Sequence, residues 1–492
     1  MSGRSATGVL LATSISALVV NANTSAVTIL LPAISADTGT PVSTLQWAVT
    51  GYSLVGAAVI VTAGALGDIF GRRKVFLAGL LLFIVSCVLI ALAQSGEGVI
   101  AGRCIQGAAG STILACGMSL ISVANEGKAR LRAVSLWGAA SAVGAAAGPL
   151  VGGVLVDTTG WQGLFWIDAA IAAACVPLTL ITVGESKDPH RSKSIDYAGT
   201  ILVAVVLAPI IFGLTEGSTW GWLSVKTIGC FLISIAAAVG FVFVERRVKA
   251  PLIDLALLRN TVLVGATLSI LVGSGAINGI MYAVSLYFQN PATLNMSAMD
   301  AGLATLPVTA AAVILAPLIT PIVGKVGLRK TVAAGFVIMA VAFAALGFAK
   351  SSWAYGVFVL PLVGIAVGMS LQNGPASSVS TTCVPADQVG AASGISNMAR
   401  YVGAAVMTAL VAAVYTAVST NRLDAGEPMG DALAAGLSRA SIALAIISAL
   451  SIGLARLVAG KPPKPETLHF AAAAASTSHT LPVAGPASAG KR

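Results

Sequence analysis

The chain has 492 residues, of which 57% are hydrophobic and only 9% are charged, and its formal net charge is +10. Soluble globular domains carry about 25% charged residues, so this composition excludes a protein that turns its whole surface to water. A strongly basic balance is also typical of nucleic-acid-binding proteins. Here the basic residues lie mostly between long apolar runs, so we expect no nucleic-acid partner.

Fourteen mostly apolar segments follow one another along the chain, joined by short loops. A hydrocarbon core about 30 Å thick requires about 20 helical residues to cross it. Each segment is therefore predicted to be a transmembrane helix, and the fold class is an all-α polytopic membrane protein. The predicted helices cover residues 8–31, 45–66, 75–94, 98–122, 133–155, 163–183, 197–215, 224–244, 262–288, 301–323, 331–349, 354–376, 391–416 and 434–457.

The Lys and Arg residues are distributed unevenly between the two sides of these helices. With the N-terminus inside, and with residues near a helix end counted on that side, 22 of the 28 fall on the inner side and 4 on the outer side, and the other two, Arg103 and Arg400, fall within predicted helices. Basic residues concentrate in the short cytoplasmic loops of membrane proteins, so both termini are predicted to be cytoplasmic. The Ala-, Val- and Gly-rich composition is typical of a GC-rich bacterial genome and so indicates a bacterial cytoplasmic (inner) membrane.

The loops and the tail divide the chain into four regions. Residues 1–184 are predicted to form an N-terminal six-helix bundle, residues 185–260 to hold cytoplasmic linkers and two extra transmembrane helices, and residues 261–459 to form a C-terminal six-helix bundle. Residues 460–492 are rich in Pro and Ala, so a disordered cytoplasmic tail is expected. A basic turn punctuated by glycines follows the second helix of each bundle, which is typical of parallel structural repeats.

Three motifs in the first bundle carry a family resemblance. They are Gly64-x-Leu66-x-Asp68-x-x-Gly71-Arg72-Arg73-Lys74 after the second helix, Arg103-x-x-Gln106-Gly107-x-x-Gly110 in the fourth, and Gly144-x-x-x-Gly148-Pro149-x-x-Gly152-Gly153 in the fifth. Together they resemble the major facilitator superfamily, and the third resembles the antiporter motif of its drug exporters. Fourteen helices with an extra central pair resemble its 14-helix drug:proton antiporter branch. The resemblance implies the major-facilitator fold, with two six-helix bundles plus two extra central helices.

The first motif is expected to act as a conformational latch formed by Gly64, Asp68, Gly71, Arg72 and Arg73. Glycines allow a tight turn against neighbouring helix ends, and Asp68 can accept hydrogen bonds from a helix N-terminus and pair with Arg72. A contact that forms in one state and breaks in the other suits alternating access. The alternative is a plain basic loop that only sets the topology.

The third motif is expected to make one face of its helix smooth. Gly144, Gly148 and Gly152 recur every four residues, and Pro149, followed by Gly153, removes a backbone hydrogen bond and can kink the helix. We expect the glycine face to pack closely on the second bundle, a contact that, by resemblance to drug exporters, limits leak. Ordinary packing of small residues between helices is the alternative.

Arg103 is the cationic residue of the second motif. An arginine within a membrane span costs at least about 2.5 kcal/mol, so it should face protein or water and have a partner. Gln106 lies one turn away and can hydrogen-bond either Arg103 or a substrate. The resemblance implies a role in proton coupling, and an arginine that ties helices together is the alternative.

The chain departs from the antiporter branch at two positions. By resemblance, an Asp is usual at the position of Asn23 and an Asn at the position of Asp168, which is the only one of the 18 acidic residues within a predicted span. Burial of a carboxyl group disfavours its charged form, so Asp168 joins Asp68 and Arg103 as a candidate for proton coupling. The alternative is a water-exposed acid at a helix mouth. The amide at Asn23 cannot titrate, so we expect neutral or anionic substrates rather than lipophilic cations.

Polar side chains at helical spacing indicate a substrate cavity near the membrane midplane, between the two bundles. Such stripes either line water or bind helices together, and both readings stay open here. Tyr282 and Trp47 offer flat surfaces to a substrate ring. The predicted cavity residues are Asn23, Gln46, Trp47, Thr50, Gln106, Asn278, Tyr282, Gln289, Gln372, Asn373 and Arg400.

These observations predict a secondary active transporter that exports a small organic molecule by alternating access in exchange for protons. An uncoupled facilitator, an importer, a lipid or glycolipid translocator and a non-transporting sensor remain alternatives. The sequence contains no nucleophile–base or metal-ligand cluster, so we expect neither an enzyme nor a metal or other cofactor. The expected partners are the substrate, protons and membrane lipid, and the expected state is a monomer.

Overall fold

The computed structural model describes residues 6–125, 127–187, 196–248, 251–253, 255, 257–384 and 388–458. Within these ranges the chain is helical and holds no β-strand. The predicted tail, residues 460–492, and part of each predicted cytoplasmic linker lie outside the described residues.

Fourteen helical segments of the described chain are long and apolar enough to cross a membrane, which confirms the number predicted. The helices are α1 (Ala6–Thr38), α2 (Val42–Leu45), α3 (Trp47–Phe70), α4 (Arg72–Ala91), α5 (Gly96–Ala124), α6 (Gly127–Thr159), α7 (Gln162–Thr182), α8 (Tyr197–Trp220), α9 (Val225–Glu245), the 3-10 helix η1 (Leu257–Arg259), α10 (Thr261–Gln289), α11 (Ala298–Ala304), α12 (Leu306–Val326), α13 (Leu328–Leu346), α14 (Tyr355–Thr382), α15 (Val389–Asp424), α16 (Met429–Ser451) and α17 (Leu454–Val458).

Several helices extend beyond their predicted apolar segments. Helix α1 continues to Thr38 and α15 to Asp424. The apolar window marks only the part of a helix that lies in hydrocarbon. Polar residues outside that layer continue the helix, because each added residue still gains a backbone hydrogen bond.

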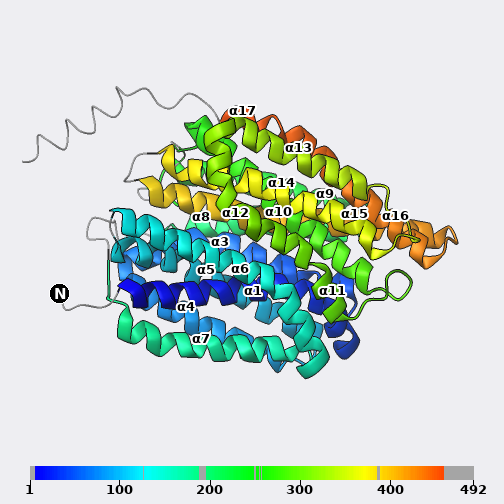
Figure 1. Cartoon of the computed structure of the whole chain (residues 1–492), viewed down its shortest axis with the longest axis horizontal. Helices are drawn as coiled ribbons and strands as arrows, with labels where there is room; N and C mark the ends of the chain where they lie inside the picture. Colours follow the sequence, from blue (N-terminus) through cyan, green and yellow to red (C-terminus); the bar gives the residue numbers. More distant parts are fainter. Residues whose placement is uncertain are drawn as a thin grey trace, which may run out of the picture.

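The long helices run side by side along the long axis of the molecule. Helices α1 and α3 to α7 lie mostly in the lower half of Figure 1 and α10 and α12 to α17 mostly in the upper half, while the short α11 is labelled in the lower half, level with α1. Helix α8 lies against both halves, because Val203, Leu207 and Ile211 pack with Ala57 of α3 and Ala405 of α15. The end at which α1 begins is called the basic end below, since the basic turn after α3 lies there.

Corresponding turns of the two halves share one backbone feature. The residue that follows α3 is Gly71, with φ of 121°, and the residue that follows α12 is Gly327, with φ of 88°. L-residues rarely adopt such angles, so a glycine is required at both places. This correspondence supports the predicted structural repeat.

Candidate functional site

A buried polar chain links α5, α1 and α7. Arg103 of α5, which is 0% exposed, donates from Nη1 to Oδ1 of Asn23 at 2.6 Å. Asn23 donates from Nδ2 to Oδ2 of Asp168 at 2.7 Å, and Asp168 is 4% exposed. The amide of Asn23 therefore stands between the positive charge of Arg103 and the carboxyl group of Asp168, with its oxygen toward one and its nitrogen toward the other.

The remaining contacts of Arg103 join two further elements. Its Nε donates to the carbonyl oxygen of Ala48 in α3 at 2.9 Å, and Nη1 also donates to Oε1 of Gln106. The guanidinium carbon lies 4.3 Å from the centre of the Tyr52 ring, at cation–π distance. Gln106 in turn donates to the sulfur of Cys87 at 3.0 Å. Arg103 is thus buried with its Nε and Nη1 groups hydrogen-bonded within the protein and its guanidinium group over the Tyr52 ring, and a buried charge requires such partners.

These contacts settle two expectations about the chain. Asp168 is not a water-exposed acid at a helix mouth, so that alternative is wrong. Arg103 does tie α1, α3 and α5 together. Asn23 and Gln106, predicted to line a cavity, are fully buried in this conformation and hold Arg103 instead.

The two bundles are bridged at the end opposite the basic end. Ser285 of α10 donates to the carbonyl oxygen of Thr28 at 2.9 Å, and Gln289 donates to that of Ile29 at 3.2 Å, both in α1. Pro32 has no N–H, so the Thr28 carbonyl lacks its partner four residues on and is available to Ser285. The polar side chains along α10 therefore hold helices together here and do not line water. Holding helices together is the second of the two roles expected for such rows of polar side chains.

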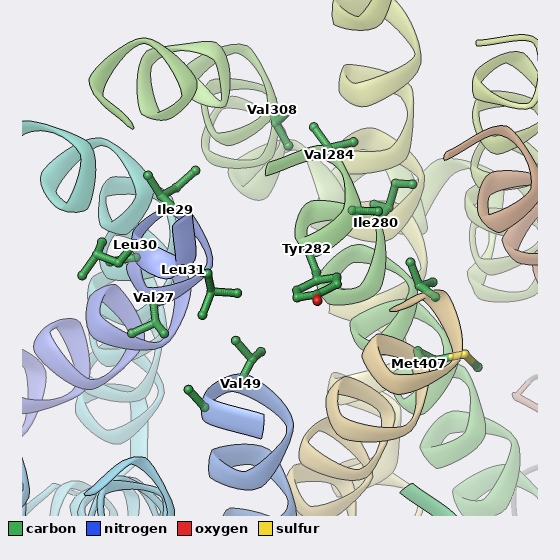
Figure 2. Close-up of a cluster of buried hydrophobic side chains, with 14 of the residues drawn as sticks. Val27, Ile29, Leu30, Leu31, Val49, Ile280, Tyr282, Val284, Val308 and Met407 are labelled. Carbon is green, nitrogen blue, oxygen red and sulfur yellow. The ribbon is translucent and has the colours of Figure 1, made fainter. Parts of the chain in front are cut away.

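Apolar side chains of both bundles also meet at this opposite end. Figure 2 shows Leu31 and Val49 of the first bundle on one side and Tyr282 of the second on the other. All three are buried. Tyr282, predicted as a flat surface for a substrate ring, is covered in this conformation.

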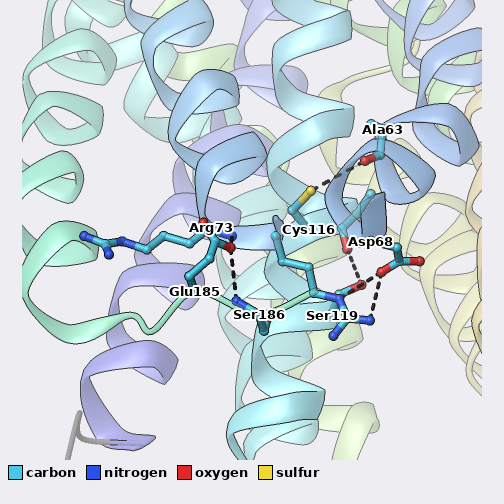
Figure 3. A network of polar contacts seen from close by, with 9 residues as sticks. Ala63, Asp68, Arg73, Cys116, Ser119, Glu185 and Ser186 are labelled. Carbon is cyan, nitrogen blue, oxygen red and sulfur yellow. Dashed lines mark hydrogen bonds and ion pairs between the residues drawn. The ribbon is translucent and has the colours of Figure 1, made fainter. Parts of the chain in front are cut away.

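The turn after α3 binds the segment that follows α7. Arg72 donates from Nε to Oδ1 of Asp68 at 2.9 Å, which confirms that these two residues pair. The backbone N–H of Arg73 donates to Oε1 of Glu185 at 3.2 Å, at the N-terminus of α4 (Figure 3). A methyl group on Gly71 would come within 2.6 Å of the Glu185 carboxyl group, so the absent side chain makes room for this contact.

Two features of this turn differ from the sequence analysis. A methyl group on Gly64 would meet nothing within 4 Å, so in this conformation Gly64 does not provide the close approach expected of it. Glu185 was not foreseen as a partner. The signal in the sequence was an acidic residue two positions after the predicted helix 163–183, on the same side of the membrane as the N-terminus of α4, because carboxylates stabilise helix N-termini.

The glycine stripe of α6 packs on α1, so the prediction that it packs on the second bundle is wrong. Methyl groups on Gly144 and Gly148 would overlap backbone carbonyls of α1, and one on Gly152 would come within 2.8 Å of Leu30 in the same helix. The periodicity showed that this face is smooth. It did not show which neighbour covers the face, and here the neighbour belongs to the first bundle.

The other residues of this motif do contact the second bundle. A methyl group on Gly153 would come within 2.5 Å of the carbonyl oxygen of Ala298 in α11, and one on Gly302 within 2.5 Å of the carbonyl oxygen of Pro149. Pro149 and Gly153 lie four residues apart and about 100° around the helix from the stripe. The motif thus serves two neighbours, with one face for each.

The other predicted cavity residues are mostly covered by protein. Trp47 packs on Phe212 of α8 with ring centres 5.3 Å apart. Arg400 of α15 is exposed and donates to Ser377 at 3.1 Å. The remaining ones are Gln46, Thr50, Gln372 and Asn373, which are buried, and Asn278, which is half-buried and donates to the backbone of its own helix. In the described ranges no group of three or more His, Cys, Asp or Glu side chains could hold a metal ion.

Comparison with known proteins places this geometry in a family. The family model "Major Facilitator Superfamily" matches residues 13–408. The chain is 32% identical over 412 residues to the multidrug resistance protein Stp of Mycobacterium tuberculosis, covering 83% of this chain and 75% of that one. It is 28% identical over 404 residues to the tetracenomycin C resistance and export protein of Streptomyces glaucescens, covering 82% and 74%.

The fold recurs in solved structures of low sequence identity. The human organic anion transporter MFSD10 matches with a TM-score of 0.64 at 15% identity, over 92% of this chain and 100% of that one. At that identity the likeness shows the fold alone. The family model, the relatives and the fourteen candidate spans agree: this chain is a transporter of the cytoplasmic membrane that belongs to the major facilitator superfamily and to its drug-exporter branch.

Proposed function

We propose that this protein exports a small organic molecule, such as an antibiotic, a drug or a secondary metabolite, by alternating access in exchange for protons. The outward direction is supported by the relatives, one named for multidrug resistance and another for resistance and export. The observation that carries the proton exchange is the buried chain from Arg103 through Asn23 to Asp168.

The chain offers a physical route from a proton to a conformational change. While Asp168 is ionised, its charge balances that of Arg103 across the amide of Asn23. A proton on Asp168 removes that balance and leaves the buried guanidinium uncompensated. A buried charge without its partner costs several kcal/mol, so protonation favours a state in which Arg103 is hydrated or paired differently.

Alternating access is supported by the contacts at the end opposite the basic end. The hydrogen bonds of Ser285 and Gln289 to α1, and the close approach of Gly153 to α11, all cross between the bundles. Opening that end requires these contacts to separate. The two hydrogen bonds are neutral, so each costs only about 1 kcal/mol to break.

The same chain bears on the charge of the substrate. Asp168 faces Asn23 and is balanced by Arg103, so it does not offer a free negative charge to a lipophilic cation. Arg400 adds an exposed positive charge. Neutral or anionic substrates are therefore favoured.

The test uses inside-out membrane vesicles with a proton gradient reported by a fluorescent dye. Matched neutral, anionic and cationic compounds are added, with tetracenomycin C among them because a relative is named for its export. Neutral or anionic compounds should collapse the gradient with the wild-type protein and should not with Asp168→Asn. Asp157→Asn, an exposed acid at the end of α6, is the control and should behave as wild type.

A variant in which positions 23 and 168 exchange their side chains tests where the titratable carboxyl group must lie. The double variant Asn23→Asp with Asp168→Asn keeps one carboxyl group and one amide in contact, with the carboxyl group directly beside Arg103. It should recover part of the gradient collapse that Asp168→Asn loses. Uptake that persists in Asp168→Asn with no proton movement even in wild type would instead establish an uncoupled facilitator.

A further inference from the structure

Arg400 lies on the side of α15 that faces the space between the bundles. Positions 403 and 407 of α15 meet α10, since a methyl group on Gly275 would contact both, and position 401 meets α3 at Gly56. At about 100° per residue, position 400 falls between these two faces. It also lies away from α8, which packs on Ala405 and Ala409.

The charge of Arg400 is held by neutral partners. Its Nη2 donates to Oγ of Ser377 at 3.1 Å, and its Nη1 donates to Oδ1 of Asn397 at 3.4 Å. A guanidinium group has five N–H donors, so these two contacts leave donors for a ligand. An arginine in a membrane helix is costly unless it meets water or a counter-charge, and the exposure of Arg400 leaves it accessible to both.

Arg103 and Arg400 differ in this respect. Arg103 is fully buried, and Asp168 balances its charge across Asn23. Arg400 is exposed, and both of its partners in the described part of the chain are uncharged. Arg103 therefore has no place for a ligand, whereas Arg400 does.

A row of polar side chains orients Arg400. Ser377 donates to Oδ1 of Asn373 at 3.3 Å, and Asn373 donates to Oγ of Ser274 in α10 at 2.8 Å. Because the Ser377 hydroxyl gives its hydrogen to Asn373, its oxygen is free to accept from Arg400. The row extends from α15 through α14 to α10 and sets the direction in which the guanidinium group points.

We propose that Arg400, positioned by Ser377 and Asn373, binds the anionic group of the substrate, a carboxylate or an ionised phenol. Such a group accepts two parallel hydrogen bonds from the planar fork of an arginine, which the point charge of a lysine cannot supply in the same geometry. This proposal rests on the proposed export function and adds to it the charge class of the substrate and the residue that recognises it.

The site is tested by arginine-specific labelling of the whole protein in nanodiscs of phosphatidylcholine, with the labelled residues identified by mass spectrometry. Phenylglyoxal is the reagent. Benzoate, naphthalene-2-carboxylate and anthracene-9-carboxylate are the probes, each beside its uncharged alcohol. Arg400 should be labelled and Arg103 should not. At least one carboxylate should slow the labelling of Arg400 at least threefold, and its alcohol should have no effect.

Three results would overturn the proposal. They are an unreactive Arg400, labelling that no carboxylate slows, and equal protection by an acid and its alcohol. Nanodiscs that contain phosphatidylglycerol form a separate arm, since protection by that lipid alone would assign Arg400 to a lipid phosphate. The variant Ser377→Ala leaves Arg400 reactive but removes its orienting partner, so protection by the carboxylate should weaken.

A transport measurement separates this proposal from the export function. In inside-out vesicles, Arg400→Gln should lose uptake of the protected carboxylate and keep uptake of the alcohol, and Arg400→Lys should recover only part of the acid transport. If the wild-type protein moves neither compound while the carboxylate protects Arg400, the export proposal fails and the anion site stands. If wild type and Arg400→Gln move the acid equally, the anion site fails and export stands.

Discussion

The hydrogen bond from Ser285 to the Thr28 carbonyl should control how long the end opposite the basic end stays closed. It is a neutral bond of 2.9 Å between the two bundles. Such a bond contributes about 0.5–1.5 kcal/mol net, and polar contacts between membrane helices average about 0.6 kcal/mol. Because this contact joins the bundles only when that end is closed, Ser285→Ala should shift the closed-to-open ratio about threefold to tenfold toward open.

The shift can be measured as a distance between spin labels by pulsed electron paramagnetic resonance. Labels at Ser43 in α2 and Asn421 in α15 report on that end, since both positions are exposed and lie in different bundles. Ser269→Ala is the matched control, because Ser269 is also buried in α10 but donates to the carbonyl oxygen of Gly265 in its own helix. A distance distribution for Ser285→Ala that matches both wild type and this control would refute the reasoning.

Substitution of Pro32 is a second way to weaken the hydrogen bond from Ser285 to Thr28. Pro32→Ala restores an N–H that competes for the Thr28 carbonyl, so it should weaken the bridge from Ser285 and also favour the open state. If both substitutions act through this one carbonyl, their effects on the ratio should not add in the double variant. Additive effects would mean that Pro32 acts elsewhere, for instance by straightening α1.

Two further predictions compare glycines that differ in their surroundings. Gly148→Ala would place a methyl group against the α1 backbone and should lower stability by about 1–3 kcal/mol, whereas Gly138→Ala, which meets nothing within 4 Å, should be neutral or stabilising because alanine favours helix. Thermal unfolding in detergent measures both, and equal melting temperatures would contradict the close α1–α6 contact. Gly71→Ala combines a positive φ with a clash against Glu185, and Gly327→Ala has the positive φ alone, so Gly71→Ala should cost about 1 kcal/mol more, the usual worth of a helix N-cap. The same unfolding assay tests that difference, which Glu185→Gln should reduce.

The number of membrane spans and the positions of the motifs could be predicted from the sequence. The thickness of the hydrocarbon layer sets the length of a crossing helix, and glycines indicate where the backbone turns tightly or packs closely. The partner of the α6 glycine stripe was not readable. Periodicity identifies a smooth face such as that of Gly144 and Gly148, and only packing decides that α1 covers it.

For the charged residues, too, the sequence determined one part and the tertiary structure the other. The sequence alone determined that Arg103, Arg400 and Asp168 lie within predicted apolar spans. Tertiary structure decided that Asn23 joins Arg103 to Asp168 across 145 residues of chain, and that Arg400 remains exposed. The physical reason is that the cost of a charge in a membrane depends on what surrounds it in space, and those surroundings come from helices far apart in the chain.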